Sequence, residues 1–290
     1  RNVHLIVTED AYIPVWGTYI TTPSVNEKFA KVNVLTKVVL PEGADPAKYS
    51  VETSVWNPNK QKLTAVRTSL AQMKYNNDQA EQEFVIQDPS LWSPEMPALY
   101  SAETRLYEGD KLKDVYTTPF GIRSIEIIPD KGFFLNGKRT VFKGVCNHHD
   151  LGPLGAAVND AAIRRQIRIL KDMGCNAIRT SHNMPAPALI RACDEMGMMI
   201  MAESFDEWNV AKCKNGYNLL FDEWAEKDLV NLLHNFRNNP SVVMWCIGNE
   251  VPNQWNEGDT KIAKWLQDIC HREDPTRPVT QGMDAPDAVI

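Results

Sequence analysis

The hydrophobic pattern of this 290-residue chain changes near Pro129, and no other feature constrains the fold as strongly. Up to Ile128, short segments rich in Val, Thr, Tyr and Ile alternate with turn residues, without a long stretch of helical period. About seven short strands at such a spacing are typical of an antiparallel sandwich. We predict strands at 31–40, 49–56, 62–69, 82–86, 100–107 and 111–120.

After Pro129, segments of helical period alternate with short apolar runs. One helix is marked by Ile163, Ile167 and Leu170 behind a cap at Asn159 or Asp160, and apolar stripes at 189–196, 229–236 and 262–269 predict three more. Parallel strands covered by helices are apolar on both faces. Such runs occur at 141–145, 176–180, 198–202, 242–247 and 278–281. Four βα units and a fifth strand fit either a doubly wound sheet or the first part of a (β/α)8 barrel.

Polar residues follow the first four of these strands, which favours the barrel. In a (β/α)8 barrel the loops at the carboxyl ends of the strands open onto one mouth, where active sites are built. Carboxylates beside Arg, His, Asn and Trp suit a sugar, whose hydroxyls need hydrogen-bonding groups and whose ring stacks on indole. In chain order the polar residues are Asn147, His148, His149, Asp150, Arg179, Ser181, His182, Glu203, Asp206, Glu207, Trp208, Asn249 and Glu250.

Each of these side chains also has a purely structural interpretation. Glu250 could accept backbone hydrogen bonds at a helix N-terminus. His182 could be a core histidine, and Arg179 could be the buried ion-pair partner of Glu203. Two tryptophans are equally plausible in packing and in binding: Trp208 and Trp245.

Charge and composition restrict the partners. The net charge of −6 comes from intermixed acidic and basic residues, which argues against nucleic acid. No run approaches the roughly 18 apolar residues that a membrane span needs. The six cysteines have irregular spacing without a CxxC pattern, and most are expected to be buried, unpaired thiols.

Several stretches together resemble glycoside hydrolase family 2, the family of β-galactosidases, β-glucuronidases and β-mannosidases. Residues 88–100 (DPSLWSPEMPALY) are similar to the end of its immunoglobulin-like domain, and 120–123 (FGIR) to the entry into its barrel. Residues 134–138 (FLNGK) and 143–150 (KGVCNHHD) resemble its first barrel strand, and 178–183 (IRTSHN) its second. The most specific stretch, 236–250 (FRNNPSVVMWCIGNE), resembles its fourth.

The resemblance implies a retaining, exo-acting β-glycosidase, β-galactosidase-like, with a carbohydrate substrate and neither cofactor nor metal. Glu250 would protonate the glycosidic oxygen and later deprotonate water, while Asn249 would hold the sugar 2-hydroxyl. Arg179 and His182 would line the subsite for the nonreducing sugar, and Asp150 is a further candidate. Retaining hydrolysis also needs a nucleophilic carboxylate roughly 5 to 5.5 Å from the acid. In the family that residue lies on a later strand, so Glu203 and Glu207 take supporting or binding roles.

The resemblance also implies a domain organisation. We expect residues 1–20 to be a linker from a missing sugar-binding domain and 21–125 to be an immunoglobulin-like β-sandwich. Residues 126–290 are expected to form the N-terminal half of a TIM barrel, with about four βα units and strand five. Such a chain should lack hydrolase activity and self-associate through its exposed barrel edges. An extracytoplasmic bacterial enzyme is favoured. Some β-galactosidases of the family carry a His shortly after the third barrel strand, whereas this chain reads FDEWN at 205–209, which argues against galactose specificity.

Two alternatives belong to other functional classes. A metal-dependent barrel hydrolase would use His148 or His149 with His182 and Asp150. Inward-facing ligands on one strand need HxH spacing, whereas this chain has adjacent histidines, only one of which can face the mouth. The other alternative is a non-catalytic carbohydrate-binding module built on the sandwich.

Overall fold

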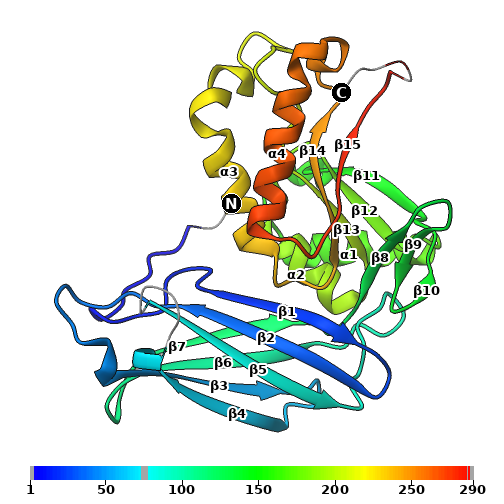
Figure 1. Cartoon of the computed structure of the whole chain (residues 1–290). Coiled ribbons are helices and arrows are strands. Elements are labelled where there is room, and N and C mark those ends of the chain that lie inside the picture. Colours follow the sequence, from blue (N-terminus) through cyan, green and yellow to red (C-terminus); the bar gives the residue numbers. More distant parts are fainter. Residues whose placement is uncertain (1–2, 73–77, 286, 288–290) are drawn as a thin grey trace.

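The computed structural model describes residues 3–72, 78–285 and 287 and places two layers of antiparallel strands against a parallel sheet with helices (Figure 1). The predicted fold class is confirmed: an immunoglobulin-like sandwich precedes part of a TIM barrel. Short 3₁₀ segments are η1 (Pro46–Lys48), η2 (Leu70–Gln72), η3 (Gly152–Leu154), η4 (Tyr217–Leu219), η5 (Pro252–Trp255) and η6 (Glu257–Asp259).

Two sheets form the sandwich. One contains β1 (Thr18–Val25), β2 (Phe29–Lys37) and β5 (Gln79–Gln87), and the other β4 (Lys62–Ser69), β3 (Tyr49–Trp56), β6 (Tyr100–Glu108) and β7 (Lys111–Phe120). Alternate residues of β5 are buried, because one face of each sheet covers the core. The six predicted strands are confirmed, three of them with the same bounds: β3, β4 and β7.

The strand β1 is missing from the sequence-based prediction. It is an edge strand that contains Pro23 and has an irregular register between Thr21 and Ser24. Proline has no amide hydrogen to donate to a neighbouring strand, so it is tolerated only at sheet edges and bulges. The presence of Pro23 therefore makes this edge strand resemble a linker in the sequence.

A small antiparallel sheet follows the sandwich, and the sequence analysis missed this one too. It consists of β8 (Ile125–Ile128), β9 (Gly132–Leu135) and β10 (Lys138–Arg139). Phe133 and Leu135 of β9 pack with Ala177, Met199 and Val243, which stand at or near the starts of parallel strands. The hairpin therefore covers the amino-terminal end of the parallel sheet, on the face opposite the helices.

The parallel sheet has sequential strand order, which decides between the two architectures left open by the sequence. The strands are β11 (Gly144–His148), β12 (Ala177–Ser181), β13 (Met199–Glu203), β14 (Val242–Asn249) and β15 (Val279–Gly282), each paired with the next in parallel. A doubly wound sheet reverses its strand order, whereas a barrel does not. The prediction placed the first strand too early: Val141 and Phe142 are apolar but exposed and precede it.

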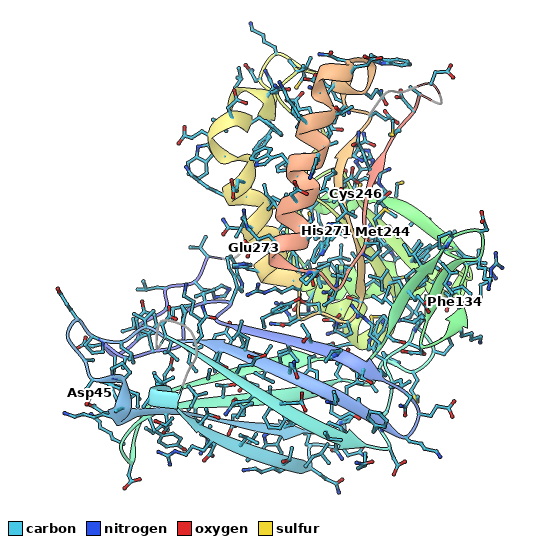
Figure 2. The ribbon with its side chains drawn as sticks, viewed as in Figure 1. Asp45, Phe134, Met244, Cys246, His271 and Glu273 are labelled. Atoms are coloured by element: carbon cyan, nitrogen blue, oxygen red, sulfur yellow. The ribbon has the colours of Figure 1, made fainter. Side chains whose placement is uncertain are left out.

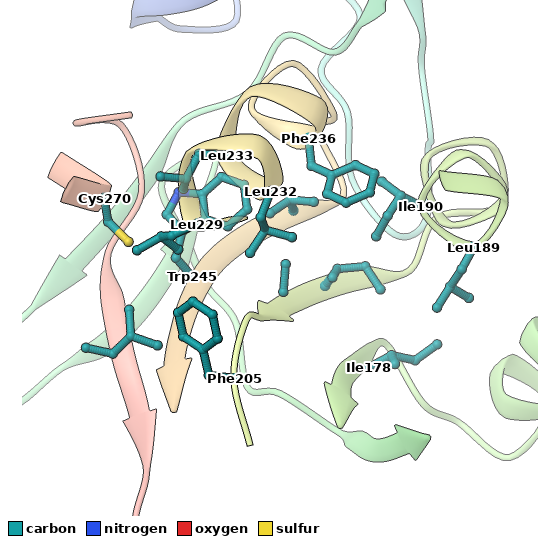
Figure 3. Packing of buried hydrophobic residues seen from close by; sticks show 14 of the residues in the cluster. Ile178, Leu189, Ile190, Phe205, Leu229, Leu232, Leu233, Phe236, Trp245 and Cys270 are labelled. Carbon is teal, nitrogen blue, oxygen red and sulfur yellow. The ribbon is translucent and has the colours of Figure 1, made fainter. Parts of the chain in front are cut away.

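The described residues contain four α-helices, as predicted: α1 (Asp160–Asp172), α2 (Pro187–Met196), α3 (Phe221–Phe236) and α4 (Thr260–Glu273). Asn159 caps α1 by accepting a hydrogen bond from the amide of Ala162. Figure 3 shows Leu189 and Ile190 of α2 and Leu229 of α3 in the same buried cluster as Trp245 of β14. All four helices contribute to this one cluster, as expected for the outer layer of a barrel.

Polar contacts join the sandwich to the start of β14. The Arg123 guanidinium is buried and donates to the carbonyls of Pro240 (2.7 Å) and Val242 (2.8 Å). Asn238 accepts from the amide of Ile20 and donates to the carbonyl of Thr18, both at 2.8 Å. Several different hydrogen bonds thus fix the segment that leads into β14.

A second polar cluster lies where α4 ends, on the side of the sandwich. Asp274 is fully buried and accepts from Arg277 (2.6 Å), from the Trp245 indole (2.9 Å) and from the Tyr19 hydroxyl of β1 (2.8 Å). Figure 2 shows Glu273 at the end of α4 nearest the sandwich, with Met244 and Cys246 along β14. The strands β14 and β15 run away from the sandwich (Figure 1), so their carboxyl ends lie on the far side of the sheet.

The six cysteines are free, as predicted, but only Cys193, Cys246 and Cys270 are buried, while Cys146 and Cys213 are exposed. Among the described residues, no helix has the length and apolar character that crossing a membrane requires.

Candidate active site

Three adjacent parallel strands bring their terminal polar residues into one hydrogen-bonded cluster. The Nη2 atom of Arg179, on β12, donates to Glu203 Oε1 of β13 and to Asn249 Oδ1 of β14, both at 2.8 Å. The predicted convergence of Arg179 and Asn249 is therefore seen in the structure. Arg179 also has the structural role considered for it, because its partner Glu203 has no exposed side-chain surface.

Glu203 is the buried centre of the cluster. Its backbone amide donates to Thr180 Oγ1 at 3.0 Å, and the Nδ1 atom of His182 lies 3.3 Å from its Oε1. Burial raises the pKa of the Glu203 carboxyl to about 7, although the hydrogen bond and charge of Arg179 oppose the shift. Burial and the charge of Arg179 lower the pKa of His182.

The raised pKa of Glu203 predicts a pH-dependent contribution to stability. Its carboxyl holds a proton up to about pH 7 in the folded state but only to about 4.5 when unfolded, so this contribution is complete below pH 4.5 and is lost as pH rises through 7. The isosteric Glu203→Gln variant should lack this decline, on the order of 2 kcal/mol. We would compare urea unfolding of both proteins from pH 5 to 8.

Other groups titrate in both proteins and cancel in the difference, including Asp194, whose pKa burial raises to about 6. Arg191→Gln, a substitution away from the cluster, serves as a control for handling. Parallel stability curves for wild type and Glu203→Gln would show that Glu203 does not hold a proton at these pH values.

The amide of Asn249 is fixed on both sides. Its Oδ1 accepts from Arg179, and its Nδ2 donates to Asp206 Oδ1 at 3.0 Å. Lys212 Nζ donates to the same Asp206 oxygen at 2.9 Å and to the Asn249 carbonyl at 2.6 Å. Partial burial by itself raises the pKa of Asp206, but the bonds from Lys212 and Asn249 outweigh it and lower the pKa, so this carboxyl is ionised at neutral pH.

Glu250 follows Asn249 at the end of β14, with an exposed side chain. Its φ of 44° is left-handed, which is uncommon for a residue with a Cβ and occurs often at functional sites. Its amide donates to the carbonyl of Gly282 of β15 at 2.8 Å. The alternative that Glu250 is a helix N-terminal carboxylate is wrong, because α4 begins only at Thr260 and the 3₁₀ segment η5 begins at Pro252, with Val251 at its cap and no acidic residue in its first turn.

Glu207 supports the loop that carries Lys212. It is buried, and its carboxylate accepts from the backbone amides of Lys212 (2.6 Å) and Asn218 (3.0 Å).

The two tryptophans that could serve either in packing or in binding are both buried inside the protein. The indole of Trp208 donates to the Ile247 carbonyl at 2.8 Å, and the indole of Trp245 donates to Asp274.

Two residues of β11 reach the cluster. The ring of His148 meets that of His182 edge-on, with centroids 5.1 Å apart, and Cys146 Sγ lies 3.9 Å from Arg179 Nη1. The neighbouring His149 turns elsewhere and lies 3.1 Å from the Ala156 carbonyl, so only one of the two histidines faces the cluster, as expected. Asp150 accepts from the amide of Gly152 at 2.7 Å and thereby closes a local turn. The structure thus brings Arg179, His182 and Asn249 together, whereas Asp150 lies on a separate turn.

Lys212 is a member of the cluster that the sequence analysis missed. It lies in the loop between β13 and α3, where no period or motif singles it out. The only signal was its position, since loops after barrel strands carry functional residues. The whole cluster offers charged and amide groups at the carboxyl ends of the strands, which suits a polyhydroxylated ligand next to an exposed carboxylate.

Comparison with known proteins covers nearly the whole chain. A family model described as the TIM barrel domain of glycosyl hydrolases family 2 matches residues 126–289, and one described as glycosyl hydrolases family 2 matches 12–123. The chain is 39% identical to a β-galactosidase of Bacteroides ovatus, over 99% of this chain and 37% of that protein. It is 30% identical to a β-glucuronidase of Bacteroides fragilis, over 97% of this chain and 41% of that protein.

Solved structures agree. A glycosyl hydrolase family 2 member from Bacteroides cellulosilyticus superposes with a TM-score of 0.91 and 36% identity, over 97% of this chain and 36% of that one. A β-glucuronidase of Bacteroides uniformis gives a TM-score of 0.79 and 26% identity, over 95% of this chain and 35% of that one. The chain therefore spans well under half the length of the proteins it matches.

Proposed function

We propose, since this chain belongs to glycoside hydrolase family 2, that it carries the acid/base side of the active site of a retaining, exo-acting β-glycosidase. One observation carries the proposal: Arg179 of β12 and Asn249 of β14 are hydrogen-bonded across the end of β13, and Glu250 comes directly after Asn249 with an exposed side chain. The rest of the active site is supplied by a longer protein of which this chain is part.

Glu250 is the acid/base residue of this proposal. In the first step a carboxylate outside the chain attacks the anomeric carbon, while Glu250 gives its proton to the departing glycosidic oxygen. In the second step the Glu250 carboxylate takes a proton from water as that water attacks the glycosyl ester. Both steps need Glu250 within reach of the scissile oxygen, which its place at the mouth of the sheet favours.

Asn249 and Arg179 bind the sugar in this proposal. The side chain of Asn249 is held between Arg179 and Asp206, so its amide meets a sugar hydroxyl without having to be ordered first. His182 lies against Glu203 beside them and lines the same subsite. Asp150 remains a weaker candidate, because its carboxylate already accepts the amide of Gly152.

The proposal is tested with the longer protein. We expect it to hydrolyse nitrophenyl β-glycosides and to release the sugar first as its β-anomer, observed by proton NMR before mutarotation. Among a panel of β-glycosides, the 39% identity to a β-galactosidase favours the β-galactoside. Release of the α-anomer, or no turnover of any β-glycoside in the panel, would contradict the proposal.

The 290-residue chain alone is the matched control of that experiment. It should show no turnover, because it supplies Glu250 but not the carboxylate that attacks the sugar. Turnover by the chain alone would place the nucleophile within it. Self-association of the chain through β11 and β15, the two edges of the parallel sheet, stays a prediction.

A further inference from the structure

Asp206 is a half-exposed carboxylate at the edge of the cluster. Its side chain is 52% exposed, and its Oδ1 takes both hydrogen bonds described above, from Lys212 and from Asn249. Within the described ranges, its other oxygen accepts no hydrogen bond. A carboxylate oxygen that is ionised, held in place and open to solvent at the mouth of a sugar site is a strong acceptor for hydroxyl groups.

The cations that touch the cluster are already neutralised. Above about pH 7, where the Glu203 carboxyl is ionised, Arg179 forms an ion pair with it, and Lys212 forms its ion pair with Asp206. A sugar that carries a carboxylate therefore meets the charge of Asp206 without a free positive charge from Arg179 or from Lys212. Binding a uronate there sets like charges side by side, whereas a neutral sugar gives hydroxyl donors to Asp206.

We propose that Asp206 selects the substrate: its carboxylate accepts hydrogen bonds from hydroxyls of a neutral sugar and repels uronic acids, so that this site takes neutral β-hexosides rather than β-glucuronides. The proposal rests on the glycosidase function proposed above and narrows its substrate class. It also concerns a residue outside the subsite assigned from the strand motifs. Lys212 is the positioning residue that fixes the carboxylate of Asp206 and the backbone next to Glu250.

The test compares substrates that differ only at carbon 6. The longer protein is assayed with nitrophenyl β-galactoside against nitrophenyl β-galacturonide, and with the β-glucoside against the β-glucuronide. Of these two pairs, the one that wild type hydrolyses faster is used for the comparison. Within that pair we expect kcat/KM of wild type to be at least roughly tenfold higher for the neutral glycoside than for the uronide. In Asp206→Asn, which keeps shape and removes charge, kcat/KM for the neutral substrate should fall about tenfold, the typical worth of one charge-assisted hydrogen bond.

The activity of Asp206→Asn on the uronide should stay level or rise, so that the preference drops by at least about tenfold. Asp222→Asn is the matched control, because it removes the same charge from an exposed position in the first turn of α3 and should leave both values unchanged. Competitive inhibition of wild type by galactose and by galacturonate measures the same preference without any substitution, should the variant not fold.

The outcomes separate this inference from the proposed function. Absence of turnover in wild type with every neutral and acidic glycoside would contradict the glycosidase function itself. Turnover that depends on Glu250, together with a wild-type preference for the uronide, would overturn the role of Asp206 alone. An equal loss on neutral and acidic substrates in Asp206→Asn would overturn it as well.

Discussion

The Glu250→Ala variant of the longer protein should lose about 10²- to 10⁴-fold in kcat/KM on alkyl and disaccharide β-glycosides, the usual contribution of general acid catalysis. The departing oxygen of such substrates is basic and cannot leave without the proton that we assign to Glu250. Dinitrophenyl glycosides have a leaving group that needs no proton, so their first step should be nearly normal in the variant. The second step then becomes limiting, because no base activates water.

Azide distinguishes this role from a structural one. It attacks the glycosyl ester without base assistance, so adding azide should accelerate Glu250→Ala on the dinitrophenyl substrate and give a β-glycosyl azide, which NMR identifies. Glu257→Gln removes an exposed carboxylate from the same loop and serves as the control. A loss that is the same for good and poor leaving groups, without an azide product, is incompatible with acid/base catalysis by Glu250.

The Asp274→Ala substitution should lower the free energy of unfolding by about 3–5 kcal/mol, as removing one partner of a buried ion pair generally does. Arg277, itself 5% exposed, would keep its charge without the carboxylate that pairs with it. The Trp245 indole and the Tyr19 hydroxyl would lose their acceptor as well. Urea unfolding of the 290-residue chain, followed by tryptophan fluorescence, measures the change.

The same group predicts the response of the protein to acid. Burial alone raises the pKa of Asp274, but Arg277, Thr276 and Tyr19 outweigh it and lower the pKa to about 2. The stability that this shift contributes, roughly 2 kcal/mol, is complete above about pH 4 and is lost as pH falls towards 2. Asp268→Asn removes an exposed pair with Lys264 and should cost less than about 0.5 kcal/mol. Equal effects of the two substitutions would show that the Asp274 pair is dispensable.

The sequence predicts the parts of the fold in which one period extends over a whole element. Helix α1 combines an apolar stripe with a capping residue, and β14 is apolar from Val242 to Ile247, so both could be identified. The strand β1 could not, because Pro23 and an irregular register interrupt its ladder. The start of β11 could not be predicted either. Val141 and Phe142 are apolar, as residues of a buried strand would be, but they are exposed and precede the strand.

The candidate site shows the same division. Arg179, His182 and Asn249 could be predicted because parallel strands present their terminal residues at one edge. Lys212 could not, because its position depends on the path of a loop. That path is fixed by hydrogen bonds from the loop backbone to the Glu207 carboxylate, and neither composition nor period encodes such contacts.

The polar contacts at the start of β14 limit how freely evolution or protein engineering can recombine these domains. Arg123 and Asn238 link the sandwich to the residues at one end of the strand that carries Glu250 at the other. A different accessory domain grafted onto the barrel would leave the carbonyl of Pro240 without its guanidinium donor and would remove one of the two that bind the carbonyl of Val242. We therefore regard the sandwich and the barrel as a single inherited unit rather than as exchangeable modules.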